Sequence, residues 1–261
     1  MSDIKNLVKN GYNYRYLLNQ LVTKSIKLKY RRSYLGVVWS LIEPLLTMVV
    51  LSFVFSTLLG RGDKYFPIYV LSGRLMYSFF SAGTKGAMKS IRNNSAMIKK
   101  VYVPKYMYPL ASCTSAYVIF LISLVDLFLV MIVMGMKITP YILLSVVPIA
   151  VAFFLAYGVG MLMATINVFF RDVEYMWDVA MMLVMYTCAI FYKVDTFIGT
   201  KAYIVFRLNP LYALIKCFRD CIYGYPMELS WILYAVAFSA VMCIVGISMF
   251  RKHQNKFVLY I

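Results

Sequence analysis

The sequence predicts an all-α integral membrane protein with six transmembrane helices, an N-terminal amphipathic interfacial helix and a broken, re-entrant segment before the last helix. Two observations support this fold class. Of the 261 residues, 62% are apolar or aromatic and 14% are charged, compared with about 45–50% and 25% in soluble domains. Several stretches are almost free of charge over about 20 residues, which is the length that a helix needs to cross a bilayer.

Residues 1–33 predict a basic amphipathic helix on the cytoplasmic membrane surface. Apolar residues recur at helical spacing from Ile4 to Ile26, with lysines and arginines between them. Such a helix lies in the membrane interface and does not span it. The first 30 residues contain no short apolar core followed by a small-residue cleavage site, so we expect no removable signal peptide.

The transmembrane domain is expected to occupy residues 34–250. Its apolar stretches predict spans at about 35–59, 66–84, 107–136, 141–170, 176–192 and 231–250. Residues 193–230 have intermediate hydropathy and are interrupted at Asn209-Pro210, which predicts two short helices of an extracytoplasmic, partly re-entrant segment. In the fourth span, small residues at four-residue spacing predict a close helix–helix contact: Ala152, Ala156, Gly160 and Ala164.

The charge distribution predicts the orientation in the membrane. Segments on the side of the two termini hold 18 lysines and arginines, including the tail at 251–261, and the opposite segments hold 9. Basic residues collect on the cytoplasmic side, so both termini are expected in the cytoplasm. The same rule accounts for the net charge of +17 through contact with anionic lipids, and no nucleic-acid partner is expected.

The sequence offers no cluster of ionisable groups of the kind that an enzyme needs. The ten acidic residues are dispersed, and the one histidine, His253, lies in the tail. The five cysteines are scattered through apolar stretches, which indicates neither a metal site nor a disulfide framework. A Walker A phosphate-binding loop is also absent. We therefore expect no catalytic residue, metal or cofactor in this chain.

Three stretches resemble one family. Residues 30–44 read YRRSYLGVVWSLIEP, residues 167–173 read NVFFRDV, and residues 209–211 read NPL. In this order and spacing they resemble the ABC-2 type permeases that export O-antigen, teichoic acid and related polysaccharides. The resemblance extends over essentially the whole chain. One departure lies in the second span, where the family often has a hydrophobic residue followed by Pro-Trp and this chain has Gly73-Arg74-Leu75-Met76-Tyr77.

The resemblance implies a homodimer bound to two ABC ATPase subunits, which carry ATP and Mg, in the bacterial cytoplasmic membrane. The substrate would be a lipid-linked polysaccharide. The segment 85–105 would be a cytoplasmic coupling loop that docks on the ATPase through Lys89, Arg92, Lys99 and Lys100. On charge alone, a basic loop that faces anionic lipids would be the favoured interpretation, and only the resemblance favours docking.

The resemblance also assigns positions in the transport path. Arg171 and Asp172 would form the short cytoplasmic turn between the fourth and fifth spans, and Asn209 and Pro210 the outer gate. The path would run between the first and fifth spans of the two subunits. Its candidate lining residues, each of which also fits a structural role, are Tyr34, Trp39, Glu43, Trp177 and Tyr186.

Two charged residues lie deep within predicted spans. Arg74 is eight residues inward from Phe66, or about 12 Å, and Asp126 is ten residues inward from Met136, or about 15 Å. A lone charge at such depth costs from about 2.5 kcal/mol upward. Since the depths nearly agree, we predict an ion pair between them. The alternative is that Arg74 extends outward while Asp126 faces a wet cavity.

Three functions from different classes remain open at this point. The leading hypothesis is the membrane-spanning subunit of an ATP-driven polysaccharide exporter. The second is an ABC-2 permease that exports a small hydrophobic compound or drug. The third, a membrane-embedded transferase, would require a cluster of acidic residues and histidines that the sequence lacks.

Overall fold

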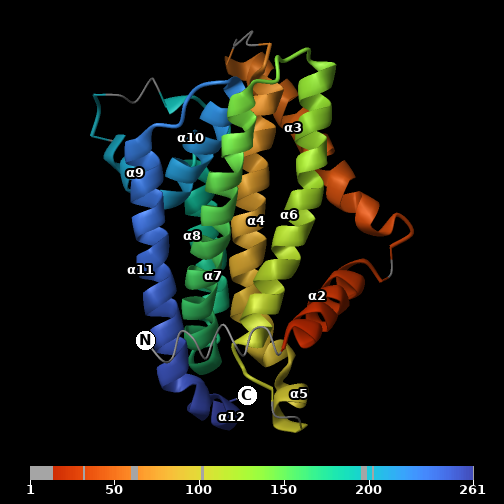
Figure 1. The fold of residues 1–261 in the computed structure, drawn as a ribbon, viewed down its shortest axis with the longest axis vertical. Helices are drawn as coiled ribbons and strands as arrows, with labels where there is room; N and C mark the ends of the chain where they lie inside the picture. Colours follow the sequence, from red (N-terminus) through yellow and green to blue (C-terminus); the bar gives the residue numbers. More distant parts are fainter. Residues whose placement is uncertain are drawn as a thin grey trace.

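A computed structural model describes residues 14–31, 33–59, 64–100, 103–194, 199–201 and 203–260. Within these ranges the chain is helical and contains no β-strand. Figure 1 shows long helices running side by side with shorter ones at both ends. The long helices are α2 (Arg15–Tyr30), α3 (Trp39–Leu59), α4 (Phe66–Asn93), α6 (Met107–Val133), α7 (Val146–Phe169), α8 (Val173–Thr187) and α11 (Leu229–His253). The shorter ones are α5 (Ser95–Lys100), α9 (Tyr203–Leu208), α10 (Pro210–Tyr223) and α12 (Phe257–Tyr260).

Four segments in the described ranges are long and apolar enough to cross a membrane: Gly36–Phe55, Met107–Val133, Pro140–Phe169 and Leu229–Tyr260. They correspond to the predicted first, third, fourth and sixth spans. The predicted second span belongs to α4, a continuous helix in which basic residues interrupt the apolar sequence. The predicted fifth span belongs to α8, whose 15 residues extend about 22 Å. The all-α membrane fold is therefore confirmed, and the count of six spans stays a prediction.

Helix α7 lies at the centre of the bundle and packs against both α4 and α11. Small residues make this packing possible. A methyl group added at Gly160 would lie 2.7 Å from Cβ of Ala87 on α4, and one at Gly158 would lie 2.6 Å from the backbone nitrogen of Cys243 on α11. Ala156 and Ala164 are fully buried. The ladder predicted on the fourth span thus brings helix backbones together, as small residues do in membrane proteins.

Two predicted boundaries differ from the structure. Helix α4 continues to Asn93, beyond the predicted end of the second span at residue 84, so the first part of the expected 85–105 loop is helical. The following α5 is a separate short helix. The predicted interfacial helix is described only from residue 14 onward; there α2 packs against α6 and buries Leu21. Residues 1–13 lie outside the described ranges.

The predicted broken segment before the last span is present. Helix α9 ends at Leu208, and α10 begins at Pro210. The side chain of Asn209 caps α10, since its Oδ1 accepts hydrogen bonds from the backbone N–H groups of Leu211 and Tyr212 at 3.0 and 3.3 Å. Proline is favourable at the first helical position because it has no N–H to satisfy. The break therefore follows from the local chemistry of Asn-Pro.

Candidate functional site

Helices α3 and α8 leave much of their surface uncovered in the single chain. Of the candidate path residues, Tyr34, Trp39, Glu43 and Tyr186 are exposed. The apolar residues Val179 and Leu183 of α8 are more than 60% exposed. Such a surface is suited to contact with lipid or with another subunit. The predicted path between these helices stays a prediction, because no second subunit is present.

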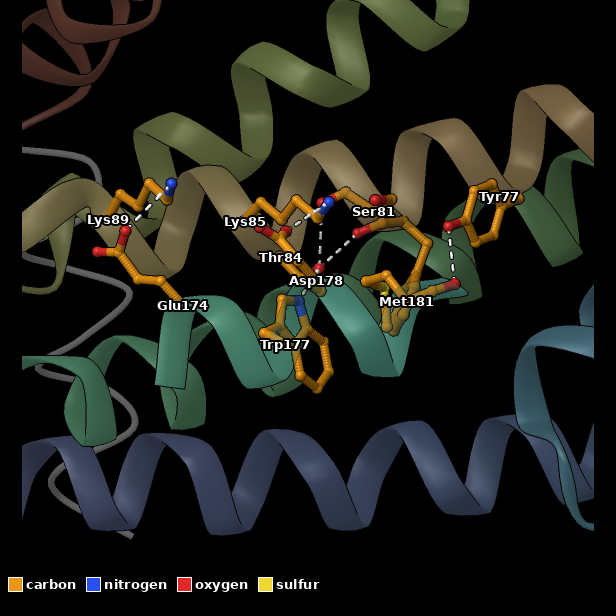
Figure 2. A network of polar contacts seen from close by, with 10 residues as sticks. Tyr77, Ser81, Thr84, Lys85, Lys89, Glu174, Trp177, Asp178 and Met181 are labelled. Carbon is orange, nitrogen blue, oxygen red and sulfur yellow. Dashed lines mark hydrogen bonds and ion pairs between the residues drawn. The ribbon is translucent and has the colours of Figure 1, made fainter. Parts of the chain in front are cut away.

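Trp177 is half-buried, unlike the other four candidates, and forms a hydrogen bond with a neighbouring helix. Its Nε1 donates a hydrogen bond of 3.2 Å to Oγ1 of Thr84 on α4. Figure 2 shows it among a row of polar contacts between the two helices. The structure therefore gives Trp177 a role in holding α8 against α4.

These contacts form what we call the α4–α8 seam: Tyr77, Thr84, Lys85, Lys89 and Arg92 on α4, with Glu174, Trp177, Asp178 and Met181 on α8. The partners recur about one helical turn apart along both helices (Figure 2). Tyr77 donates to the Met181 carbonyl oxygen at 2.8 Å. Lys85 Nζ lies 2.7 Å from Oδ1 of Asp178. The seam joins α8 to α4 by side-chain chemistry over much of its length.

Glu174 is the acidic centre at the end of the seam nearest the α7–α8 turn. Its carboxylate forms ion pairs with Arg92 and, at 3.1 Å, with Lys89, and it accepts a hydrogen bond of 3.1 Å from Nδ2 of Asn167. Burial alone would raise the pKa of Glu174, but the hydrogen bonds from Asn167 and Lys89 and the two positive charges outweigh burial and lower it. Glu174 is therefore held in its charged form.

The four predicted coupling residues occupy two different environments. Lys89 and Arg92 are bound to Glu174, so they connect α4 to α8. Lys99 and Lys100 lie exposed at the end of α5. Arg92 lies in the last turn of α4, directly before α5. The basic residues on α5 are thus available to a partner protein, while those on α4 already have an intramolecular role.

The two predicted sequence motifs have clear positions. Arg171 and Asp172 are exposed in the short turn between α7 and α8. Asn167 of the same motif is buried, and its Nδ2 also donates to the Met88 carbonyl oxygen at 3.0 Å. Asn209, besides capping α10, donates from Nδ2 to Oγ1 of Thr187 at 3.0 Å. Asn209 therefore connects α10 to the end of α8.

A buried arginine at the outer end of the bundle was missed by the sequence analysis. Arg219 of α10 donates to the carbonyl oxygens of Ala189, Tyr69 and Ile190 at 3.0, 2.9 and 3.4 Å. Its guanidinium lies 3.4 Å from the centre of the Tyr69 ring. We call these residues, together with Gly73, the outer clamp. The clamp also holds Ala189 at a φ of 48°, which is unfavourable for a residue with a Cβ.

The predicted ion pair between Arg74 and Asp126 is wrong. Arg74 Nη1 lies 3.9 Å from Sδ of Met185 on α8, and its guanidinium is 5.9 Å from the centre of the Tyr77 ring. Asp126 is buried, and its Oδ2 has no hydrogen-bond partner. Both residues belong to the described part of the chain, and neither a hydrogen bond nor an ion pair joins them. Depth does not determine which face of a helix a side chain occupies.

Arg74 instead lines a cavity of about 610 Å³. Its walls are α4 and α6, with α2 at one end, α3 on another side and Met185 contributed by α8. In Figure 1, α2 and α3 diverge from each other beside α6. Ten of the 22 lining residues carry a hydroxyl group, and three are charged: Lys29, Glu43 and Arg74.

Metal ligation has no support in the described part of the chain, where no group of three histidine, cysteine or acidic side chains is close enough to hold an ion. The polar side chains that the structure brings together are those of the seam, the outer clamp and the cavity. Their arrangement suits helix coupling and polar ligand contact.

Comparison with known proteins identifies relatives along most of the chain. An O-antigen export system permease protein RfbA from Klebsiella pneumoniae is 27% identical over 257 residues, covering 96% of this chain and 98% of the relative. The protein of the same name from Myxococcus xanthus is 25% identical, covering 96% and 97%. The polysialic acid transport protein KpsM of Escherichia coli is 20% identical, covering 90% and 92%.

The family assignment rests on a separate match. The sequence profile of the ABC-2 type transporter family matches residues 16–223, from α2 to the end of α10. This range includes the seam, the cavity and the outer clamp. The chain therefore belongs to the ABC-2 type transporter family.

Proposed function

We propose that this chain is the membrane-spanning permease subunit of an ATP-driven exporter of a cell-surface polysaccharide. The observation that carries the proposal is the end-to-end similarity to permeases named for O-antigen export. A relative named for polysialic acid transport matches over a similar range. The shared cargo class is a long glycan, so a glycan is the favoured substrate over a small hydrophobic compound.

In this proposal the permease works as a homodimer in the bacterial cytoplasmic membrane, with both termini in the cytoplasm. Two copies of an ATPase chain bind it and supply ATP hydrolysis. The glycan is attached to a lipid carrier and leaves the cell through a path between the two permease subunits. The exposed surfaces of α3 and α8 support this arrangement, because a partner subunit would cover them.

The seam suggests how the ATPase would act on the path. Lys99 and Lys100 on α5 would meet the ATPase, and α5 follows directly after α4. Lys85, Lys89 and Arg92 of α4 bind the acidic residues of α8. A displacement of α5 would therefore move α8, the helix that borders the proposed path.

Deletion of the gene in its own host tests the proposed cargo. We expect one surface glycan to disappear and to accumulate inside the cell on its lipid carrier, and we expect the wild-type gene to restore it. An unchanged set of surface glycans in the deletion strain would reject polysaccharide export. Increased sensitivity to a hydrophobic compound, without any glycan change, would favour the drug exporter instead.

A charge-reversal pair tests the docking role of α5. Lys99→Glu combined with Lys100→Glu should abolish export and the co-purification of an ATPase subunit, because like charges would then face each other. The matched control reverses two exposed lysines of the C-terminal segment, Lys252 and Lys256. Equal loss in both double variants would show a general effect of cytoplasmic charge, as expected if the lysines only orient the protein.

A further inference from the structure

The cavity between α2, α3, α4 and α6 has the dimensions of a ligand site. Its volume of about 610 Å³ falls within the roughly 300–1,000 Å³ typical of small-molecule pockets. It lies within one chain, and four of the five candidate path residues do not line it. Glu43 is the candidate that does. The cavity is therefore distinct from the proposed path between subunits.

Its hydroxyl groups are mostly fixed as hydrogen-bond acceptors. Six of them already donate their proton to backbone carbonyl oxygens, so that lone pairs remain for a ligand. These are Ser25, Ser40, Thr47, Tyr77, Ser115 and Ser123. A ligand that fills this space must therefore bring hydrogen-bond donors of its own.

Two charged side chains in the cavity have unused hydrogen-bonding capacity. Among the described residues, the Glu43 carboxylate has no hydrogen bond or ion pair. Arg74 has only two weak contacts, one to the sulfur of Met185 and one to the face of the Tyr77 ring. No ion pair joins the two. The cavity therefore offers a ligand an acceptor, the Glu43 carboxylate, and several donors, the N–H groups of the Arg74 guanidinium. Each charged group would be costly to leave unpaired in an apolar membrane.

This balance of donors and acceptors selects the ligand class. Lys29 and Arg74 could bind a phosphate group, but phosphate brings only acceptors and would also face the acceptor hydroxyl groups and the Glu43 carboxylate. An apolar molecule would leave the charges of Glu43 and Arg74 without a ligand partner. A saccharide carries hydroxyl groups that donate and accept at once. Phe79 and Phe120, whose stacked rings are 5.2 Å apart, add apolar surface to the same lining.

We propose that the cavity is a saccharide-binding site within each protomer, in which Glu43 accepts hydrogen bonds from sugar hydroxyl groups and Arg74 donates to them. The inference rests on the proposed function, since it names a second place where the exported glycan contacts the permease. A site of this size holds one sugar or a short oligosaccharide and would recognise a part of the glycan before it enters the path.

Cysteine protection tests this site directly. Ser78 on α4 and Ser112 on α6 line opposite walls of the cavity and are half-buried. The full chain carrying Ser78→Cys or Ser112→Cys is placed in lipid nanodiscs and treated with N-ethylmaleimide. The probes are a panel of methyl hexopyranosides and, separately, inorganic phosphate. We expect at least one sugar to slow the alkylation of both cysteines and phosphate to have no effect.

The Glu43→Gln variant then identifies the residue that binds. It keeps the shape of the side chain and removes the charge, so the sugar concentration for half-protection should rise about tenfold, the effect of losing one charge-assisted hydrogen bond. The matched control is Glu228→Gln, which removes a carboxylate outside the cavity and should leave protection unchanged. If Glu43→Gln is poorly folded, Arg74→Lys provides the same comparison from the donor side.

Each result decides the matter. Protection by a sugar that weakens in Glu43→Gln or Arg74→Lys supports the site. Protection by phosphate alone, or by no probe, overturns it, as does sugar protection that neither variant weakens. The proposed function is judged separately by the deletion strain. If deletion abolishes glycan export while no sugar protects the cavity, the exporter assignment stands and the saccharide site fails.

Discussion

Replacing Gly73 with alanine is expected to destabilise the protein, although alanine is the better helix former. A methyl group at Gly73 would lie 2.4 Å from Nη2 of Arg219, too close for any real contact. The guanidinium would have to move. It is held by three carbonyl oxygens and by the Tyr69 ring, so movement breaks at least the bond from Nη2 to the Tyr69 oxygen.

The two opposing effects differ in size. Glycine to alanine within a helix gains about 0.5–1 kcal/mol. A hydrogen bond made by a charged group contributes about 1.5–3 kcal/mol, and here the loss would leave one N–H group of a buried guanidinium without its partner. The net change for Gly73→Ala is therefore a loss of about 1–2 kcal/mol.

Gly86 on the same helix provides the control. A methyl group there would lie 3.5 Å from Cβ of Ser112, which is an ordinary contact, so Gly86→Ala should be neutral or stabilising by up to about 1 kcal/mol. Unfolding of both variants in detergent, followed by circular dichroism against denaturant, measures the difference. Equal stability of the two variants would refute the reasoning that Arg219 requires a glycine at position 73.

Three further predictions follow from other contacts. Asn209→Ala should lower stability by about 1–2 kcal/mol, because α10 loses its cap, and Asn209→Asp, which keeps the accepting oxygen, should retain part of it in the same unfolding measurement. Asp126→Leu should leave stability unchanged or raise it, since Oδ2 of Asp126 is buried without a partner among the described residues. The changes in unfolding free energy caused by Asp126→Leu and Arg74→Leu should add in the double variant. If they do not add, the ion pair between the two residues is supported after all. Because the pKa of Glu174 is lowered in the folded protein, its contribution to stability is complete above the ordinary glutamate pKa of about 4.3 and is lost as pH falls through the folded value. Glu174→Gln should therefore reduce the loss of unfolding free energy at acidic pH. The same acid-dependent loss in Glu174→Gln and in the unchanged protein would contradict this.

Local chemistry could be predicted well from the sequence. The break at Asn209-Pro210 follows from a helix-capping side chain and an imino acid at the first helical position. The ladder on the fourth span follows from the size of its side chains, and Gly160 does contact α4 closely. Both features depend on residues near each other in the chain. No knowledge of the three-dimensional arrangement was needed to anticipate them.

Features that depend on a distant helix could not be predicted in the same way. Hydropathy falls at Lys85, which predicted the end of the second span, yet α4 continues to Asn93. The helix continues there with Lys85 and Lys89 bound by Asp178 and Glu174 of α8. Arg219 was counted among the basic residues of an outer segment, although it is buried. Its partner Tyr69 is 150 positions away in sequence, and nothing in the local pattern indicates that contact.

Arg74 shows how one assumption led to both an error and a better hypothesis. The depth argument was sound in placing a charge within the second span, where it requires compensation. It failed because depth does not determine the direction of a side chain, and Arg74 contacts Met185 of α8 and the Tyr77 ring. The structure places Arg74 in the lining of a cavity to which Glu43 also contributes, a residue whose predicted role was contact with substrate. Since the contacts of Arg74 with Met185 and the Tyr77 ring are weak, we infer that a polar ligand in the hydroxyl-lined cavity completes its hydrogen bonding.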